Sequence, residues 1–537
     1  MKKFFLFAAV AGMLASCSSE SLTGSDPNIE PAQEERVPIL LGVSSPSVNV
    51  SRGTTRGTGT VGGVGVGDPN NGWVGQRIHA FMFKKDSLVL ATDDADKPYY
   101  NEAEMITPGT TYNLIPGQST ATNIGEAMLA DGKIQYYPHI GNFDFFGYHG
   151  DDAVPAENVD KSDSLWVVPF VINGSQDLMS TKAVLTDAQA TAMGQSTDYY
   201  SAKAARKDVQ PVLSFNHLLS RLAFVIKAGN DNAGGWVAAQ DAVLYNDVDE
   251  YNAAKGTNLN ADEFAALNEG EKTKIPAVLA HQDVDKAVYV KSIEVLSKTT
   301  GKMAVAWTNE PSDKITWTND GSPDWLALKE RPVRYCLNSA PATSTSITKA
   351  AYDVLPDGAE AGDANDKTDY SLGYCLKSDP TTVITKAAYD VLPDGATDGD
   401  ANDKTDYTVL TNANDALVAL TPTYPTMTTS GVYPETSVGE ALIVAPSTED
   451  YQMHVTVSQK VPTNWNTPTA LDTKEQTYEL NIPVPVDDHA TDTVNEAAFQ
   501  ANTSYKVVLT VYGFERIVVT TEIKPWDTGA PINVGQD

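Results

Sequence analysis

Short segments in which every second residue is apolar recur along the chain, and they constrain the fold more than any other feature of the sequence. Segments 37–43 and 505–511 are two examples. A period of two places alternate side chains on opposite faces of a β-strand. Between the segments lie stretches rich in Gly, Pro, Asn and Asp, which are typical of β-sandwiches rather than βαβ units. The sequence therefore predicts a mainly β protein with a few short helices, such as 187–194 and 261–268.

The length and the charge of the chain narrow the classes of protein that fit it. A chain of 537 residues is too long for one typical domain, so we expect at least two. It has 38 Lys and Arg against 70 Asp and Glu, a formal net charge of −32, which repels nucleic acid and anionic lipid. Beyond the first twenty residues, no apolar run is long enough to span a membrane. We therefore expect no nucleic-acid partner and no transmembrane helix.

The N-terminus has the parts of an export signal. Basic residues precede an apolar stretch from Phe4 to Leu14, and small residues follow. The phrase Leu14-Ala-Ser-Cys17 also matches a bacterial lipobox, in which the sulfur of Cys17 receives a diacylglycerol. We predict a lipoprotein signal peptide at 1–17 and a polar tether at 18–36, so that the protein reaches the membrane only through the lipid on Cys17. Ordinary signal cleavage beside an incidental cysteine is the alternative.

A tandem duplication occupies about 335–407. Residues 347–358 return as 384–395, and residues 362–370 return as 399–407. We interpret this repeat as an exposed insertion, where extra residues cost little loop-closure entropy. Cys336 and Cys375 lie in the same phrase of the two copies, so a disulfide between them and two unpaired copies of one residue are both open.

No motif with catalytic spacing is present. The sequence has no His-Glu-x-x-His, no Cys-x-x-Cys and no Gly-x-Ser-x-Gly, so we predict that the protein is not an enzyme and needs no cofactor. Gly57 to Gly62 matches the dinucleotide pattern in letters, but no helix follows it, and 53–72 is better interpreted as a linker. His217 lies among apolar residues and is predicted to be a structural imidazole rather than a base.

A metal site is not expected. The segment from Asp398 begins like a calcium loop, but it lacks the glycine at position six and the glutamate at position twelve. We predict a solvated acidic turn. If a metal were bound, its best ligands would be Asp363, Asn365, Asp366, Asp400, Asn402 and Asp403.

Several phrases occur in a recognisable order. They are Ser51-Arg52-Gly53 to Gly57, Tyr136-Tyr137-Pro138, Phe143-Asp-Phe-Phe-Gly-Tyr148, Asp177-Leu-Met179, Phe215-Asn-His217 to Phe224, Asn502-Thr-Ser-Tyr505 to Leu509, and Ile523-Lys-Pro-Trp526 to Gly529. Together with the lipobox, this order resembles the fimbrillin-like family, the subunits of the type V pili of Bacteroidia. The resemblance spans nearly the whole chain except the duplicated insertion.

The resemblance implies two transthyretin-like β-sandwich domains in tandem, at 37–212 and 213–537, with the duplicated insertion in the second domain. It also implies export as a lipoprotein of the outer membrane. An Arg-specific surface protease would then remove the first strand, and the subunits would polymerise by strand exchange into an extracellular fimbrium. The boundary between the domains is expected near Val212.

The residues near the front of the chain fit that mechanism. The first strand, 37–50, is followed by Arg52 and Arg56 in a Gly- and Thr-rich stretch that a protease could enter. Either arginine could be the cut site, and Arg52 is preferred because it directly follows the strand. The apolar residues of the removable strand are Val37, Ile39, Leu41 and Val43. Removing it would leave unpaired backbone groups and empty apolar pockets, which a strand from a neighbour could fill.

A donor strand must alternate in the same way. The C-terminal segment 517–537 does so, with apolar residues at Ile517, Val519, Ile523, Trp526, Ile532 and Val534. The alternative is that this segment simply completes its own sandwich.

The predicted function is that of a structural pilus subunit that supports adhesion. Its partners would be other pilus subunits, the Arg-specific protease and a host or bacterial surface ligand. The alternative is a pilus tip adhesin or a surface glycan-binding lipoprotein. The sequence leaves open whether the subunit belongs to the shaft, the tip or the anchor.

Overall fold

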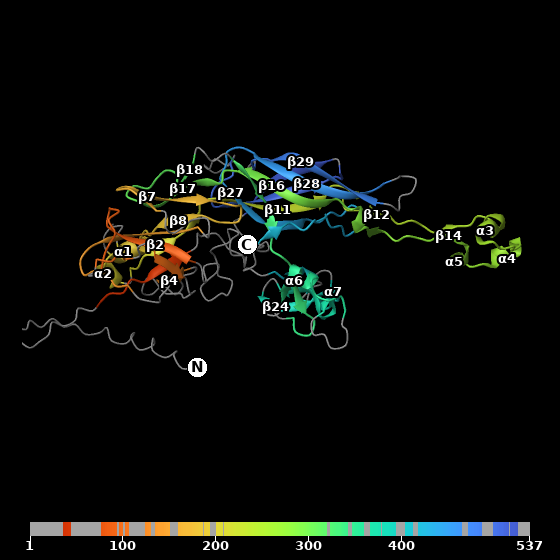
Figure 1. The fold of residues 1–537 in the computed structure, drawn as a ribbon, viewed down its shortest axis with the longest axis horizontal. Helices are drawn as coiled ribbons and strands as arrows, with labels where there is room; N and C mark the ends of the chain where they lie inside the picture. Colours follow the sequence, from red (N-terminus) through yellow and green to blue (C-terminus); the bar gives the residue numbers. More distant parts are fainter. Residues whose placement is uncertain are drawn as a thin grey trace, which may run out of the picture.

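The computed structural model describes most of the chain as an elongated β-rich body (Figure 1). The described residues are 36–44, 77–93, 96–99, 103–106, 124–129, 135–150, 159–185, 187–193, 200–207, 209–318, 323–341, 346–358, 366–376, 379–393, 403–411, 417–463, 471–485, 498–514 and 516–524. Strands predominate among them and the helices are short, so the predicted mainly β class is confirmed.

The N-terminal half is built on one eight-stranded sheet. In spatial order its strands are β10 (Asn216–His217), β8 (Met179–Lys182), β5 (Phe143–His149), β2 (Arg77–Lys84), β3 (Ala103–Ile106), β4 (Ile124–Leu129), β1 (Leu41–Ser44) and β9 (Val212–Ser214). The short helices α1 (Asp187–Met193) and α2 (Ala202–Ala205) add side chains to the core on one face of this sheet. Helix α2 begins at Ser201, whose hydroxyl accepts a hydrogen bond from the N–H of Ala204 at 3.1 Å.

The other face of this sheet packs on a four-stranded sheet that joins the two halves of the chain. Its order is β18 (Ile315–Trp317), β17 (Thr300–Trp307), β7 (Leu165–Val171) and β6 (Asp160–Lys161). Aromatic side chains from both sheets form the core between them, including edge-to-face contacts of Trp166 with Phe81 and Phe83. Strand β5 is therefore buried along its whole length.

The C-terminal half is a sandwich of two four-stranded sheets. One has the order β27 (Thr436–Val444), β11 (Ser220–Ala228), β30 (Thr503–Val511) and β31 (Ile517–Lys524). The other has the order β19 (Asp324–Ala327), β16 (Tyr289–Ser297), β28 (Tyr451–Pro462) and β29 (Leu471–Ile482). Alternate residues of these strands meet in one apolar core, as the period of two predicts.

Between β11 and β16 the chain forms a long arm that projects from one end of the body (Figure 1). Its stalk consists of β12 (Trp236–Val237) with β15 (His281–Gln282), and of β13 (Val243–Leu244) with β14 (Thr273–Ile275). Its tip carries α3 (Val248–Lys255), α4 (Ala261–Ala266) and α5 (Glu269–Lys272). Asn260 with Glu263, and Asn268 with Glu271, form capping boxes that start the last two helices.

The duplicated segment forms a small sheet of its own beside the sandwich. Its strands are β22 (Ile347–Thr348), β21 (Arg334–Leu337), β23 (Tyr370–Leu376), β24 (Asp379–Thr385) and β25 (Tyr407–Val409). Each copy adds one helix, α6 (Lys349–Asp353) or α7 (Lys386–Asp390), and one 3-10 turn, Lys367–Asp369 or Lys404–Asp406. The hairpin of β20 (Lys329–Glu330) and β26 (Val418–Ala419) flanks the point where the segment leaves and re-enters the sandwich.

Strand pairing crosses the expected domain boundary near Val212. Strand β7 belongs to the first half of the chain, yet its sheet neighbour β17 belongs to the second half, with Gly301 opposite Phe170. The division into tandem transthyretin-like domains stays a prediction.

Candidate functional site

The described part of the expected first strand lies inside the N-terminal sheet. Ile39 and Leu41 are 5% and 1% exposed, and both belong to the core of the eight-stranded sheet, with Val37 packed against it. Val43 lies further along the same strand. The alternation seen in the sequence thus turns Ile39 and Leu41 towards the core, as a strand with a period of two requires.

Strand β1 has a neighbour on each side, and the two neighbours run in opposite directions. On one side β4 is antiparallel, with Leu41 opposite Ala127. On the other side β9 is parallel, with Gly42 opposite Val212. The N–H of Gly42 donates to the carbonyl of Pro211 at 2.9 Å. Both edges of the strand are therefore hydrogen-bonded.

Before β1 begins, the chain is already held by backbone hydrogen bonds. Pro38 forms an isolated bridge with Tyr136. The N–H of Ile39 donates to the carbonyl of Gln135 at 2.8 Å, and the N–H of Tyr137 donates to the carbonyl of Val37 at 2.9 Å. Pro38 lacks an N–H, and none is needed at this position, because the ladder bonds come from the residues on either side of the bridge.

A side chain takes the place of a strand on the other side of this segment. The N–H of Leu40 donates to Oε1 of Gln210 at 3.2 Å, and Nε2 of Gln210 donates to the carbonyl of Pro38 at 3.4 Å. Gln210 is 6% exposed, and its own carbonyl accepts from Nε2 of Gln189 at 3.1 Å. The side-chain amide of Gln210 thus forms hydrogen bonds with two backbone groups of the segment. These bonds do not depend on the side chains at positions 38 and 40, except that position 40 must have an N–H.

The eight-stranded sheet closes on itself around β1. Strands β9 and β10 stand at the two ends of the sheet order, yet only Phe215 separates them along the chain. The sheet must therefore curve so that its two end strands come close together. Strand β1 is then an interior strand of a nearly closed, barrel-like sheet. Because β1 is not an edge strand, its removal would leave a slot between β4 and β9.

Burial holds the strand in this slot. Each of Ile39 and Leu41 contributes about 1.5–3 kcal/mol on burial, or about 3–6 kcal/mol together before entropy is counted. The contacts described are apolar side chains in the core, backbone hydrogen bonds and the side-chain amide of Gln210, so the site is suited to binding a β-strand.

The expected donor residues fall into two groups. Ile517, Val519 and Ile523 lie in β31, which pairs with β30 as the edge strand of their own sandwich; Ile517 is 7% exposed and Val519 packs against the same core. Trp526, Ile532 and Val534 lie outside the described residues, as do the lipidation residue Cys17 and the processing residues Arg52 and Arg56.

The acidic turns of the repeat differ from the expectation where the structure describes them. Asp366 and Asp403 are 0% and 2% exposed, so these carboxylates are not solvated. Asp366 Oδ1 accepts from the N–H and the hydroxyl of Thr368 at 2.7 and 2.5 Å, and these bonds hold its pKa below the usual value. The carboxylate of Asp366 caps the 3-10 turn Lys367–Asp369, and Asp403 directly precedes the corresponding turn Lys404–Asp406. The likeness to a calcium loop did not indicate this role. Asp363, Asn365, Asp400 and Asn402 lie outside the described residues.

The two cysteines of the repeat are free thiols, and both are buried. Cys336 lies opposite Ser371, whereas Cys375 lies opposite Val383 and Thr408. The two residues therefore occupy corresponding places in successive copies rather than facing one another. Burial raises the pKa of both thiols, which keeps them protonated and unreactive.

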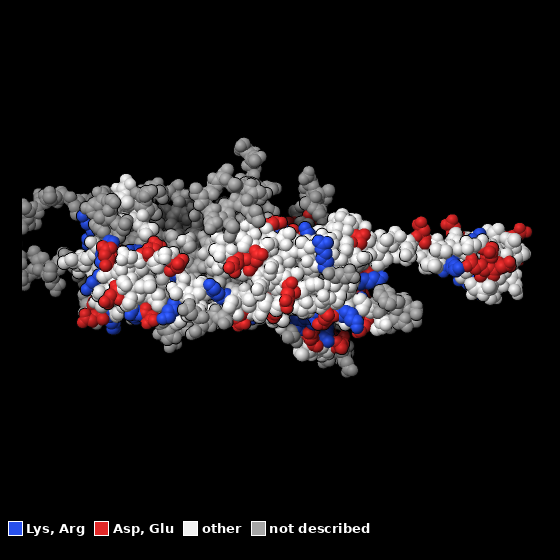
Figure 2. All heavy atoms as spheres, turned by 90° about the horizontal axis from the view of Figure 1, so that it is seen from above, with Lys and Arg blue, Asp and Glu red and all other residues white. Residues whose placement is uncertain are grey.

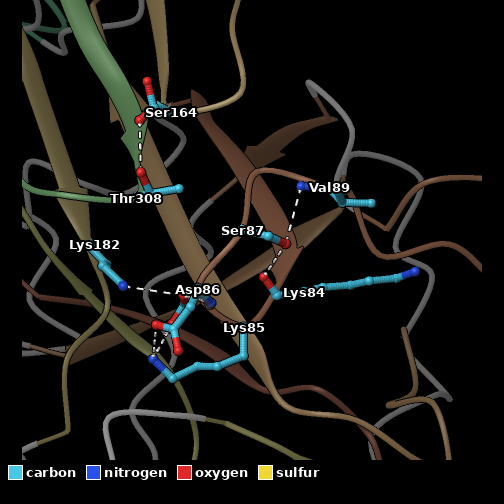
Figure 3. Close-up of polar contacts among 9 residues, drawn as sticks. Lys84, Lys85, Asp86, Ser87, Val89, Ser164, Lys182 and Thr308 are labelled. Atoms are coloured by element: carbon cyan, nitrogen blue, oxygen red, sulfur yellow. Dashed lines mark hydrogen bonds and ion pairs between the residues drawn. The ribbon is translucent and has the colours of Figure 1, made fainter.

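A second polar network fixes the end of β5 in the same half of the molecule. Asp144 is 3% exposed, and its carboxylate accepts from the N–H of Asp86 at 3.0 Å. Lys182 lies 3.3 Å and Lys85 3.8 Å from this carboxylate. Figure 3 shows the side chains of both lysines beside Asp86. Asp86 has a positive φ of 57°, so the network stabilises a tight turn after β2 rather than forming a site open to a ligand.

In the ranges given above, no three His, Cys, Asp or Glu side chains are grouped so that they could hold a metal ion. Over the same part of the chain, no helix is long and apolar enough to cross a membrane.

Gln210 and strand β9 were not predicted from the sequence. Only a domain boundary was expected near Val212, and nothing in residues 209–213 indicated pairing with a segment 170 residues earlier. The one available signal was a glutamine flanked by Val209, Val212 and Leu213.

Comparisons with known proteins find distant structural similarity. No family profile and no curated protein sequence matches the chain. A candidate cell adhesion protein from Bacteroides uniformis is 12% identical over 92% of this chain and 99% of that one, with a TM-score of 0.35. Another from Bacteroides ovatus is 10% identical over 92% and 99%, with a TM-score of 0.29. The fimbrial anchor protein Mfa2 from Porphyromonas gingivalis is 10% identical over 55% and 68%, with a TM-score of 0.18. These scores are too low to establish a shared fold or family.

Proposed function

We propose that this protein is a structural subunit of a cell-surface pilus, a member of the fimbrillin-like family that supports adhesion. It is exported as a lipoprotein, held at the outer membrane by the lipid on Cys17, and built into an extracellular fimbrium after an Arg-specific surface protease cuts at Arg52 or Arg56. In this proposal the chain is not an enzyme and needs no cofactor, and its halves are tandem transthyretin-like sandwiches.

The observation that carries the proposal is the place of β1 in the eight-stranded sheet. A strand near the front of the chain is bonded to β4 and β9 on its two edges and buries Ile39 and Leu41 in the core. Once the chain is cut beyond this strand, only non-covalent contacts hold it. The slot that it leaves can be satisfied by another strand with the same apolar pattern.

The donor in this proposal is the tail that follows β31. Residues 517–524 already complete their own sandwich, and withdrawing them would expose the core that Ile517 and Val519 cover. We therefore assign the donor role to the segment 525–537, which follows this strand along the chain. A subunit that offers a tail and accepts one at a different place assembles head to tail, and such an interface extends into an open filament when its rotation does not close a ring.

Proteolysis of the purified protein tests this function. A Cys17→Ala variant, which cannot receive the lipid, is treated with an Arg-specific protease and examined for a ladder of oligomers that resist mild detergent. The matched control replaces both Arg52 and Arg56 with Lys, which keeps the charge but removes the cut site. Oligomers in the first variant and monomers in the control are expected. Monomers that persist after complete cleavage at Arg52 or Arg56 would contradict the proposal.

The projecting arm supports the second candidate function, that of a tip adhesin or glycan-binding lipoprotein. No residue of 236–286 is fully buried, although Tyr251 contacts the rings of Tyr245 and Phe264. Acidic side chains crowd the outer end of the arm (Figure 2). Trp236, at the base of the arm, packs against the sandwich core, whereas the tip reaches beyond the body (Figure 1) and is therefore suited to contacting a partner.

Removal of the tip separates the two functions. Leu244 and Thr273 are paired across the stalk, so residues 246–271 can be replaced by a short Gly-Ser loop without disturbing the sandwich. The intact and shortened proteins are compared on a glycan array and on host cells. Binding that is lost with the tip supports the adhesin, whereas an intact protein that binds nothing contradicts it.

A further inference from the structure

The slot around β1 imposes a position-by-position pattern on any strand that fills it. Position 38 carries no N–H, and position 40 must offer one to Gln210. Positions 39 and 41 hold apolar side chains in the core. Position 42 is a buried glycine whose N–H donates to Pro211. The pattern is therefore Pro, apolar, any residue with an N–H, apolar, Gly.

The C-terminal tail repeats this pattern. Residues 38–42 read Pro-Ile-Leu-Leu-Gly, and residues 531–535 read Pro-Ile-Asn-Val-Gly. The dipeptide Pro-Ile occurs at these two places in the whole sequence and nowhere else. The apolar residues Ile532 and Val534 would enter the pockets of Ile39 and Leu41, and valine is smaller than leucine by one methylene, so no overpacking results. Asn533 corresponds to Leu40, where the slot contacts the backbone N–H through Gln210, so the difference in side chain is tolerated.

Each chain has one slot but two segments that fit it, residues 38–42 and residues 531–535. This excess indicates that the second segment fills the slot of another molecule. In the uncut protein the chain's own residues 38–42 fill the slot, so no tail can bind there. In a cut molecule the vacancy appears, and a tail from another copy can enter it. The same backbone contacts are then available, since Gln210 and the strands β4 and β9 belong to the acceptor.

We propose that residues 531–535 of a second copy occupy the slot in a single register, with Pro531 at the position of Pro38 and Gly535 at that of Gly42. The inserted strand runs antiparallel to β4 and parallel to β9. Gln210 is a positioning residue, because it accepts from the N–H at position 40 and donates to the carbonyl at position 38. A register that placed Pro531 at position 40 would lose the first of these bonds. The inference rests on the proposed strand exchange and adds which residues are exchanged and how they are aligned.

Engineered disulfides test the register. In the Cys17→Ala background, Ala127→Cys is combined with Val534→Cys, because Val534 in the proposed register lies opposite Ala127, as Leu41 does in the precursor. The control pair combines Gly125→Cys with Val534→Cys, which is two residues out of register. The uncut Leu41→Cys/Ala127→Cys precursor should form a bond within one molecule and shows that the geometry permits it.

After protease treatment and mild oxidation, the first pair should give a ladder of disulfide-linked oligomers, and the control pair should not. A ladder from the control pair, a bond formed only within single molecules, or no bond in either pair while the wild type polymerises would overturn the register. A wild type that fails to polymerise at all would instead overturn the strand exchange on which the register rests. The two failures are therefore distinguishable.

A proline at position 533 tests the role of Gln210. Asn533→Pro removes the N–H that Gln210 accepts, whereas the matched variant Asn533→Ala keeps it. We expect polymerisation of the proline variant to be about tenfold weaker and that of the alanine variant to match the wild type. Equal polymerisation of both variants would contradict the proposed hydrogen bond between residue 533 and Gln210.

Discussion

Nδ1 of His217 and Oδ2 of Asp177 are in direct hydrogen-bonding contact, and both side chains are almost completely buried. The same histidine donates its backbone N–H to Oδ1 of Asn502 at 3.4 Å, so the pair lies where the N-terminal sheet meets the turn before β30. His217, expected to be a structural imidazole, therefore connects the two halves of the chain; we call its contacts with Asp177 and Asn502 the joint.

Removing one member of this pair should weaken the joint. Asp177→Ala leaves the buried imidazole without this partner, and we expect the free energy of unfolding to fall by about 1–3 kcal/mol, as measured by chemical denaturation. The control is Glu294→Ala. The carboxylate of Glu294 lies 3.9 Å from His454 and is 43% exposed, so its loss should change stability by less than about 0.5 kcal/mol. Equal effects of the two substitutions would contradict this account of the joint.

Shortening Leu41 should loosen the first strand. Leu41→Ala leaves a cavity in the N-terminal core, and we expect a loss of about 2–5 kcal/mol of stability in the uncut protein. After cleavage, release of the strand should be faster for the same reason. Leu40→Ala is the control, because Leu40 is only half-buried and should cost less. A Leu41→Ala variant as stable as the Leu40→Ala variant would show that the strand is not held by its core face.

One copy of the repeat should be dispensable. Strand β23 pairs with β21 with Cys336 opposite Ser371, and β25 pairs with β23 with Cys375 opposite Thr408, so the same ladder is built twice. Deleting 371–407 places Thr408 directly after Tyr370, where Ser371 stood. We expect this variant to fold with an unchanged melting temperature of the main body, measured by calorimetry. Deleting 371–389 removes half a unit and should unfold the small sheet; the reverse result would contradict the two-unit description.

The stability of the sandwich should depend on pH through Glu440. Burial raises the pKa of this carboxyl above its usual 4.5, although Arg331 lies 3.4 Å away and opposes the shift. A carboxyl with a raised pKa binds its proton more tightly in the folded state, so stability falls as the pH rises through the window above 4.5. Denaturation at pH 5 and pH 8 should show a smaller decrease for Glu440→Gln than for the wild type. An identical decrease would contradict this assignment.

The period-two pattern was enough to predict the fold class, and it placed strands such as β30 and helices such as α4 close to where the structure has them. These features follow from local burial and from caps that lie within a few residues. The neighbours of β1 could not be predicted, because Gln210 and Ala127 meet it through contacts between distant parts of the chain. The burial of Asp366 was not predicted, because a segment rich in acidic residues is ordinarily expected to be exposed to solvent. Its burial follows from the 3-10 turn that it caps.

The most direct test of the central claim is to lock β1 in place and then release it. In the Cys17→Ala background, Leu41→Cys and Ala127→Cys are paired across β1 and β4, so a disulfide holds the strand after the protease has cut beyond it. Size-exclusion chromatography of the cut protein should show monomers when oxidised and polymers after reduction, with the wild type polymerising under both conditions. Polymers in the oxidised, fully locked protein would show that assembly does not require departure of the first strand.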